Sequence, residues 1–155
     1  AMNDELKIAS ATQRRHGDQY AVLVMDLDAF KQINDTYGHQ AGDQVLKDFV
    51  ELIKAYSRKE DRLFRFGGEE FLLLLPNTDQ DSLQTVASHL QQQVALQLKG
   101  PGGTVTMSSG GAILQRGEHW EAMLQRADQR LYLAKSAGRN RAIVSDDTEV
   151  HALDN

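Results

Sequence analysis

Apolar and polar positions along this chain predict an alternation of strands and helices. Residues 20–25 (YAVLVM) form a continuous apolar run, as expected for a strand that is buried on both faces. A second strong run covers 71–75 and follows a shorter one at 63–66. Because two glycines separate these runs, they predict a β-hairpin with strands near 62–66 and 70–75.

Helices are predicted around these strands from apolar residues at i, i+3 and i+4 spacing. Glycines and capping residues mark their ends. The expected helices are an exposed one that ends near Gly17, a short one over 30–37, one that starts near Ala41, one capped by Thr78 or Asp79, and one over about 118–136.

A strand over 104–114 and a final strand over 141–144 complete the pattern, after a turn at 100–103. Gly110 and Gly111 predict a bulge or a close backbone contact within the longer strand. The order is therefore β-α-α-β-β-α-β-α-β. A hairpin inside an alternation of helices and strands implies an α/β (α+β) fold, with helices packed on the faces of a mixed sheet.

Composition narrows the class of protein. The chain has 155 residues, enough for one domain with a full core, and a net charge of −5 without a basic stripe. Nucleic acid is therefore not expected as the main ligand. The absence of cysteine excludes disulfides and thiolate metal sites. No apolar run reaches the roughly 20 residues that span a membrane, and no signal-peptide pattern is seen. We therefore expect a cytoplasmic domain that makes no direct contact with a membrane. The full-length protein could still be tethered to one.

Two pairs of acidic residues are the first candidate chemistry. Asp26 and Asp28 close the first strand, and Glu69 and Glu70 lie at the hairpin turn. If that strand lies beside the hairpin, the carboxylates meet at one edge of the sheet and repel one another unless a divalent cation neutralises them. Such ligands suit Mg²⁺ or Mn²⁺, with substrate phosphates completing the shell. The alternative is that both pairs are solvated turn acids.

Two glycines and two cations could bring a phosphate close. Gly67 and Gly68 in the hairpin turn can adopt positive φ and let a backbone or a phosphate approach. Lys135 and Arg139, at the end of the last helix and just past its Gly138 stop, could clamp a polyphosphate. Cations are also common at that place for reasons of the helix dipole alone.

Two further pairs suggest purine binding. Asn34 and Asp43 can read a guanine edge, although each alone is also a usual helix-end residue. Arg58 and Asp61 lie just upstream of the hairpin and could bind a planar purine and its phosphate. Alternatively, Arg58 and Asp61 form a surface ion pair that contributes little to stability. His39 has no metal-spaced partner and is interpreted as structural.

Three segments together resemble the GGDEF family, the diguanylate cyclases. They are DLDAFKQINDTYGHQAGDQVL (26–46), RKEDRLFRFGGEEF (58–71) and ADQRLYLAKSAGRNR (127–141), in the family's order and spacing and with the signature in its GGEEF form. The resemblance covers nearly the whole chain, as one domain over 1–155. It implies a ferredoxin-like palm with a central five-stranded sheet, similar to that of nucleotide cyclases.

The resemblance also implies roles for the candidate residues. Asp26, the backbone carbonyl of Leu27, and Glu69 would bind two Mg²⁺ ions with Glu70 close by. Glu69 would also help to deprotonate the attacking hydroxyl. Asn34 and Asp43 would bind the guanine of GTP. The β- and γ-phosphates would be bound by the amides of Ala29 and Phe30 together with Lys31, Lys135 and Arg139. Gly67 and Gly68 would let the hairpin turn pass against the nucleotide.

The activity implied is condensation of two GTP molecules to cyclic di-GMP with release of pyrophosphate, which needs an antiparallel homodimer because each domain holds one GTP. Arg58 and Asp61 match the family's RxxD inhibitory site for the product. His89 stands near the place where an Arg of a neighbouring domain often joins that site, so the form of this clamp stays open. The rival functions are a non-catalytic receptor for GTP or cyclic di-GMP, and a nucleotidyl transferase with another base choice.

The family's usual DxLTGLxNR-like segment does not precede the first helix, since the chain starts at Ala1-Met2-Asn3. We therefore expect a fragment of a longer protein. Any sensory or dimerising region of that protein would lie N-terminal to this domain.

Overall fold

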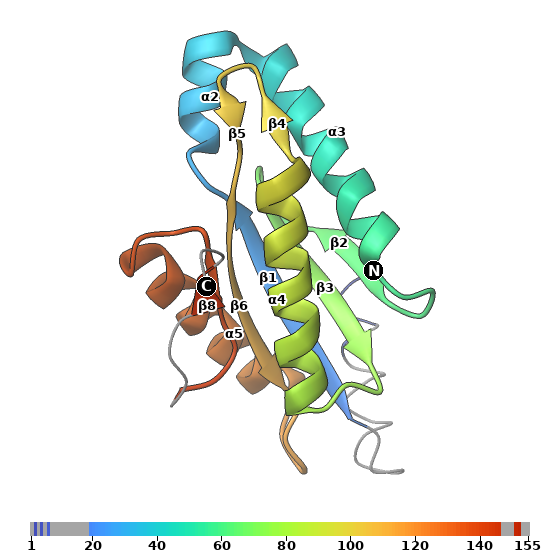
Figure 1. Ribbon diagram of the computed structural model, residues 1–155. Helices are drawn as coiled ribbons and strands as arrows, with labels where there is room; N and C mark the ends of the chain where they lie inside the picture. Colours follow the sequence, from blue (N-terminus) through green and yellow to red (C-terminus); the bar gives the residue numbers. More distant parts are fainter. Residues whose placement is uncertain (1, 3, 5, 7–18, 147–150, 153–155) are drawn as a thin grey trace.

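The structure is a computed structural model that describes residues 2, 4, 6, 19–146 and 151–152. The predicted helix that ends near Gly17 lies outside these residues, apart from helical positions at 2, 4 and 6. The remaining elements follow the predicted order (Figure 1).

A mixed sheet forms the centre of the molecule. Its neighbouring strands are antiparallel except for β6 and β7, which are parallel. The five predicted strands are therefore confirmed, and a two-residue strand extends the edge of the sheet. In sheet order the strands are β2 (Arg62–Arg65), β3 (Glu70–Pro76), β1 (Tyr20–Leu27), β6 (Met107–Ile113), β7 (Arg141–Ile143) and β8 (His151–Ala152).

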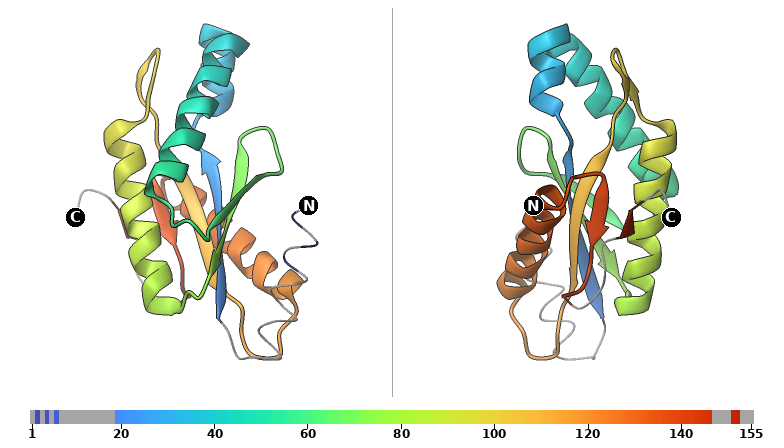
Figure 2. Two further views of the ribbon diagram at one scale, coloured as in Figure 1. Left: turned by 90° about the vertical axis from the view of Figure 1, so that its right-hand side faces the viewer. Right: turned by 60° about the vertical axis from the view of Figure 1, so that its left-hand side comes forward.

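Helices cover both faces of this sheet (Figure 2). Leu23 and Met25 of β1 belong to the core under α3 and α4, whereas Val22 and Val24 belong to the core under α5. The continuous apolar run of β1 is explained by these two cores, because alternate side chains of a strand point to opposite faces. The helices are α2 (Phe30–Tyr37), α3 (His39–Tyr56), α4 (Gln80–Gln97) and α5 (Trp120–Ser136).

Gly110 lets α5 approach the sheet closely. A Cβ at this position would lie 2.2 Å from both the Ala127 carbonyl oxygen and the Leu131 nitrogen. The predicted close backbone contact is therefore confirmed. The alternative of a bulge is wrong, because the pairing of β6 with β1 runs without interruption from Leu27↔Met107 to Ala21↔Ile113.

Two boundaries differ from the prediction. Helix α3 begins at His39 rather than near Ala41, because Gly38 both ends α2 and caps α3: its N–H donates to Asn34, and its carbonyl accepts from Gly42. The predicted strand over 104–114 is divided, since β5 (Gly103–Thr104) pairs with β4 (Lys99–Gly100) in a separate hairpin. Gly103 permits this turn with a φ of 115°.

Candidate active site

The end of β1 and the turn of the β2–β3 hairpin lie side by side. Asp26 in β1 is the register partner of Glu70 in β3, and the N–H of Leu27 donates to the carbonyl of Glu69 at 3.4 Å. The sheet therefore brings three of the predicted carboxylates, those of Asp26, Glu69 and Glu70, to one edge. The juxtaposition follows from the antiparallel pairing of two strands that are far apart in the sequence.

These carboxylates carry more negative charge than their surroundings neutralise. Burial raises the pKa of Glu69, the neighbouring Asp26 and Glu70 carboxylates raise it further, and Lys135 partly offsets them. Lys135 reaches across from α5 and pairs with the buried carboxylate of Asp26. One ammonium group cannot balance three carboxylates, so the donor set fits an additional cation with a preference for oxygen ligands. Within the described residues, no group of three or more His, Cys, Asp or Glu side chains is already arranged around a metal position.

Asp28 does not belong to this charged group, contrary to the expectation from sequence. Its carboxylate accepts hydrogen bonds from the hydroxyls of Thr106 at 2.7 Å and Ser108 at 2.6 Å, and from the N–H of Asn140 at 3.0 Å. The prediction failed because donors from remote parts of the chain satisfy the Asp28 carboxylate, whereas the Asp26 carboxylate meets Lys135.

The turn between β1 and α2 brings the first backbone amides of a helix to the end of the strand that carries Asp26. Ala29 has a φ of 58°, which is uncommon for a residue with a side chain, and caps α2 without a side-chain hydrogen bond. The first N–H groups of a helix lack intrahelical acceptors, so those that start at Phe30 suit an anion. The side chain of Lys31, by contrast, is 89% exposed and pairs with Asp35 at 3.6 Å.

The loop after α5 carries the other predicted cation. Gly138 and Arg139 both have positive φ, 124° and 65°, and the N–H of Arg139 donates back to the carbonyl of Ala134. Lys135 thus lies at the carboxylates while Arg139 is exposed one turn further on. Lys135 is therefore not simply a dipole cation, because it has a specific partner in Asp26.

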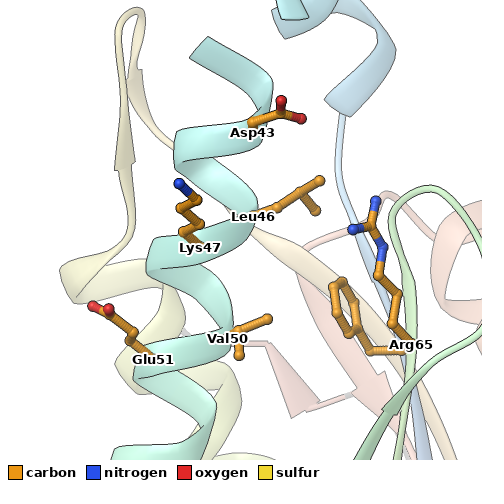
Figure 3. Close-up of a pocket in the computed structure, with 7 residues that line it drawn as sticks. Asp43, Leu46, Lys47, Val50, Glu51 and Arg65 are labelled. Carbon is orange, nitrogen blue, oxygen red and sulfur yellow. The ribbon is translucent and has the colours of Figure 1, made fainter. Parts of the chain in front are cut away.

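A pocket of about 510 Å³ lies between α3 and the hairpin. Asp43, Leu46 and Val50 point from α3 toward the hairpin, and Arg65 extends toward them from the other side (Figure 3). The wall that α3 forms is therefore apolar at Leu46 and Val50, with the carboxylate of Asp43 at one end. Asp43 lies just past the first turn of α3, because that helix starts earlier than predicted.

Asn34 supplies an unusual polar atom near this pocket. Its side-chain oxygen is buried and has no hydrogen-bond partner within the described part of the chain. A Cβ on Gly42 would lie 1.8 Å from that oxygen, so Gly42 in α3 makes the room that the Asn34 amide occupies. A buried acceptor without a donor is unfavourable, which suits a site completed by a ligand that donates. The sequence signal for Gly42 was a glycine inside a helical pattern, and it was overlooked.

The glycines of the hairpin turn matter because they lack a side chain, and not because their dihedral angles are unusual. Gly67 and Gly68 are not among the residues with positive φ, so the turn does not use the left-handed conformation that they permit. A Cβ on Gly67 would meet Glu70 Oε1 at 2.8 Å, whereas the space beside Gly68 is open. Arg65, which the sequence reading passed over, donates to the carbonyls of Gly67 at 3.2 Å and Gly68 at 2.6 Å and lies over the ring of Phe71. The turn is therefore held by an arginine and left open on one side.

Arg58 and Asp61 form a built corner at the opposite end of the hairpin. The Asp61 side chain is 1% exposed and accepts from the Arg58 guanidinium and from the Arg58 N–H, at 2.8 Å each. The same guanidinium donates to the Pro76 carbonyl and the Thr78 hydroxyl, both at 2.8 Å. A weak surface ion pair is therefore excluded. A pocket of about 400 Å³ beside this corner is also lined by Lys54, Lys59 and Arg62.

A central strand that delivers carboxylates to a helix N-terminus, with a half-apolar pocket alongside, is suited to binding a nucleotide through its phosphates and its base. The fold and the site thus define a nucleotide-binding palm domain. Residues 1–141 match the family described as "Diguanylate cyclase, GGDEF domain". The chain belongs to this family, and the predicted family and fold are confirmed.

Relatives and solved structures agree with that assignment. The chain is 38% identical to the diguanylate cyclase DgcP of Pseudomonas aeruginosa over 94% of its length, and 40% identical to DgcM of Escherichia coli over 81%. Among solved structures, the GGDEF domain of Caulobacter crescentus DgcB in complex with c-di-GMP is similar with a TM-score of 0.87, at 35% identity over 93% of this chain and 88% of that one. The active GGEEF domain of a diguanylate cyclase from Vibrio cholerae gives a TM-score of 0.87 at 30% identity, over 94% of each chain.

The chain spans 22% of the length of DgcP and 31% of that of DgcM. In the described part of the chain, no helix has the length and apolar character that crossing a membrane requires.

Proposed function

We propose that this chain condenses two GTP molecules into cyclic di-GMP and releases two pyrophosphates. The observation that carries this proposal is the meeting of Asp26, Glu69 and Glu70 beside the N-terminus of α2. In each of two steps, the 3′-hydroxyl of one GTP attacks the α-phosphate of the other. A new phosphodiester forms, the bond to the β-phosphate breaks, and the hydroxyl proton leaves to a nearby base.

Enzymes of this family depend on a metal, and we propose two Mg²⁺ ions per active site. Asp26, Glu69 and the backbone carbonyl of Leu27 would hold them, because their excess negative charge fits divalent cations with oxygen ligands. Bound there, the two ions would neutralise the phosphates and stabilise the charge of the transition state. Glu69 would also help to take the hydroxyl proton, because its carboxylate lies beside the reacting groups.

The remaining predicted residues would position the nucleotide. The unpaired oxygen of Asn34 and the carboxylate of Asp43 would accept the N–H groups on the guanine edge, with Leu46 packed against the base. The amides of Ala29 and Phe30 would bind the terminal phosphates. Lys135 would exchange Asp26 for a phosphate oxygen, Lys31 and Arg139 would add charge, and the open side of Gly67 and Gly68 would admit the nucleotide.

One such site binds one GTP, so turnover would need two domains that face each other as an antiparallel homodimer. Arg58 and Asp61 would bind the product at a separate place, where Lys54, Lys59 and Arg62 provide a cationic lining for its phosphates. The DgcB structure holds c-di-GMP, which supports a binding site for the product in this fold. A cytoplasmic location is part of the proposal, since GTP is there.

The test is chromatography of the nucleotide products after incubation with GTP and Mg²⁺, over a range of protein concentrations. The expected result is cyclic di-GMP, at a rate per protein molecule that rises with concentration. Binding of GTP or cyclic di-GMP without any product would support the receptor function instead. Turnover of ATP at an equal rate would support a nucleotidyl transferase of another base choice.

A further inference from the structure

The loop between α5 and β7 is held in a conformation that its residues do not favour by themselves. Gly138, Arg139 and Asn140 follow one another with φ values of 124°, 65° and 50°. Left-handed backbone is unfavourable for residues with a side chain, and it persists where the surroundings impose it. The contacts that impose it therefore decide where Arg139 lies.

Asp28 is one of these contacts. Its carboxylate accepts the N–H of Asn140 at 3.0 Å and also the hydroxyls of Thr106 and Ser108, and its own N–H donates to the Thr106 carbonyl at 2.9 Å. Asp28 also directly precedes Ala29, the left-handed residue that starts α2. One buried carboxylate thus fixes both backbone segments that flank the expected phosphate position.

Gln91 in α4 is the second contact. Its side chain is 1% exposed and donates to the Met107 carbonyl at 2.6 Å and to the Asn140 side-chain oxygen at 3.3 Å. Its own oxygen accepts the Ser109 hydroxyl at 3.3 Å. A buried amide on the apolar face of a helix is unfavourable unless it is bonded in this way, so its position there reflects the bonds that it makes.

We propose that Asp28, Asn140 and Gln91 are positioning residues that hold the α5–β7 loop at the phosphate end of the site. Through this loop they set the preference for a nucleoside triphosphate over a diphosphate. The inference rests on the proposed function, because it takes Arg139 as a contact of the terminal phosphates. It adds residues that touch neither nucleotide nor metal, including one on α4.

The experiment compares the affinities of the full chain for 3′-deoxy-GTP and 3′-deoxy-GDP with Mg²⁺, by calorimetry. These nucleotides lack the attacking hydroxyl and cannot be consumed. Asn140→Gly keeps a residue that tolerates positive φ but removes the side-chain acceptor, and Gln91→Met keeps the volume but removes the amide. Each variant, and Asp28→Asn, is expected to lower the triphosphate-to-diphosphate affinity ratio about tenfold, the effect of one hydrogen bond to a charged group.

Two control variants make the same Asn→Gly and Gln→Met changes at positions outside the α5–β7 loop and its contacts. Asn77→Gly alters another asparagine with a φ of 50°, at the far end of β3, and Gln92→Met alters the exposed neighbour of Gln91 on α4. Both are expected to keep the wild-type ratio. Urea unfolding separates the effect from a loss of fold, because Asn140→Gly relieves backbone strain and should not lower the free energy of unfolding.

Arg139→Ala distinguishes the inference from the function on which it rests. If Arg139→Ala lowers the affinity ratio while Asn140→Gly and Gln91→Met retain it, the positioning role is overturned and the phosphate contact stands. If Arg139→Ala retains the ratio as well, both the phosphate contact and the positioning role are overturned.

Discussion

The two ends of the β2–β3 hairpin use charge in opposite ways. At the turn, the carboxylates of Asp26, Glu69 and Glu70 crowd together with Lys135 as their cation. Burial raises the pKa of Glu69, and the repulsion between these carboxylates raises it further. At the base, the guanidinium of Arg58 is matched by Asp61 and by neutral acceptors from the β3–α4 connection. The first end is short of positive charge, whereas the second is already satisfied.

This difference separates a site that needs a ligand from one that tolerates a ligand. Like charges that are held together by strand pairing store repulsion, which a bound cation can relieve. A paired buried corner stabilises the fold first, and any ligand there must compete with hydrogen bonds that already exist. Mutations at the two ends should therefore affect activity and stability in opposite proportions.

The largest expected effect is the loss of activity when a carboxylate of the hairpin turn is removed. Glu69→Ala should lower the rate of cyclic di-GMP formation by ~10³-fold or more, because it removes a ligand and a base at the reacting phosphate. The free energy of unfolding should stay equal or rise, since a repelling charge is removed. Product chromatography and urea unfolding measure the two quantities. Glu121→Gln, an exposed acid of α5, is the control, and a Glu69→Ala variant that is fully active would contradict the assignment.

The base of the hairpin should respond in the reverse sense. Arg58→Ala leaves the buried carboxylate of Asp61 without its guanidinium and should lower the free energy of unfolding by about 2 kcal/mol, less than a fully buried pair, because Arg58 is 36% exposed. The initial rate should remain near that of the wild type, with weaker inhibition by cyclic di-GMP. Lys59→Ala, which changes the exposed neighbour, should leave the free energy of unfolding unchanged. Unaltered inhibition in Arg58→Ala would remove the inhibitory site from this corner.

A glycine in the pocket offers a sharper separation of function from fold. Gly42→Ala should weaken GTP binding by about tenfold, since the new methyl group displaces the Asn34 amide from the base position. The free energy of unfolding should change by less than about 1 kcal/mol, because alanine favours the helix that glycine weakens. Calorimetry with GTP and with ATP is the measurement. Equal losses for both nucleotides would show that Asn34 does not read the base.

The smallest effect concerns another pre-paired charge, Glu118 with Arg126. Burial raises the pKa of Glu118, but hydrogen bonds from Arg126 and from the Gln115 N–H outweigh it, so the pKa lies below its ordinary value of 4.5. A lowered carboxylate pKa stabilises the fold above the unfolded value, and this contribution is lost as pH falls through the folded pKa. Glu118→Gln should therefore be less stable than wild type by about 1 kcal/mol at pH 7, and the difference should shrink as the pH falls below 4.5 and through the lowered pKa of Glu118. Urea unfolding across pH tests this, and a difference that grows in acid would contradict it.

Much of the fold could be read from local patterns. The double-sided apolar run of β1, the hairpin and the stripes of the helices each follow from side-chain periodicity, which needs no distant partner. Two boundaries differed from the prediction. The start of α3 depends on Gly38, which both ends α2 and caps α3, and the start of β6 depends on a turn at Gly103 within a stretch of strand-like residues. Such details depend on which neighbour satisfies each backbone group, and a linear pattern does not contain that choice.

The sequence alone determined the residue types of the site: carboxylates at the end of β1 and in the hairpin turn, an amide in α2 and an acid in α3, and cations in the last turn of α5 and just past it. The tertiary structure decided which of them work together. It separated Asp28 from the charged group, gave Arg65 the task of holding the turn, and placed Gly42 under Asn34. The physical reason is that hydrogen-bond donors and excluded volume come from strands and helices remote in the chain, so the state of a polar side chain is known only once its neighbours are packed around it.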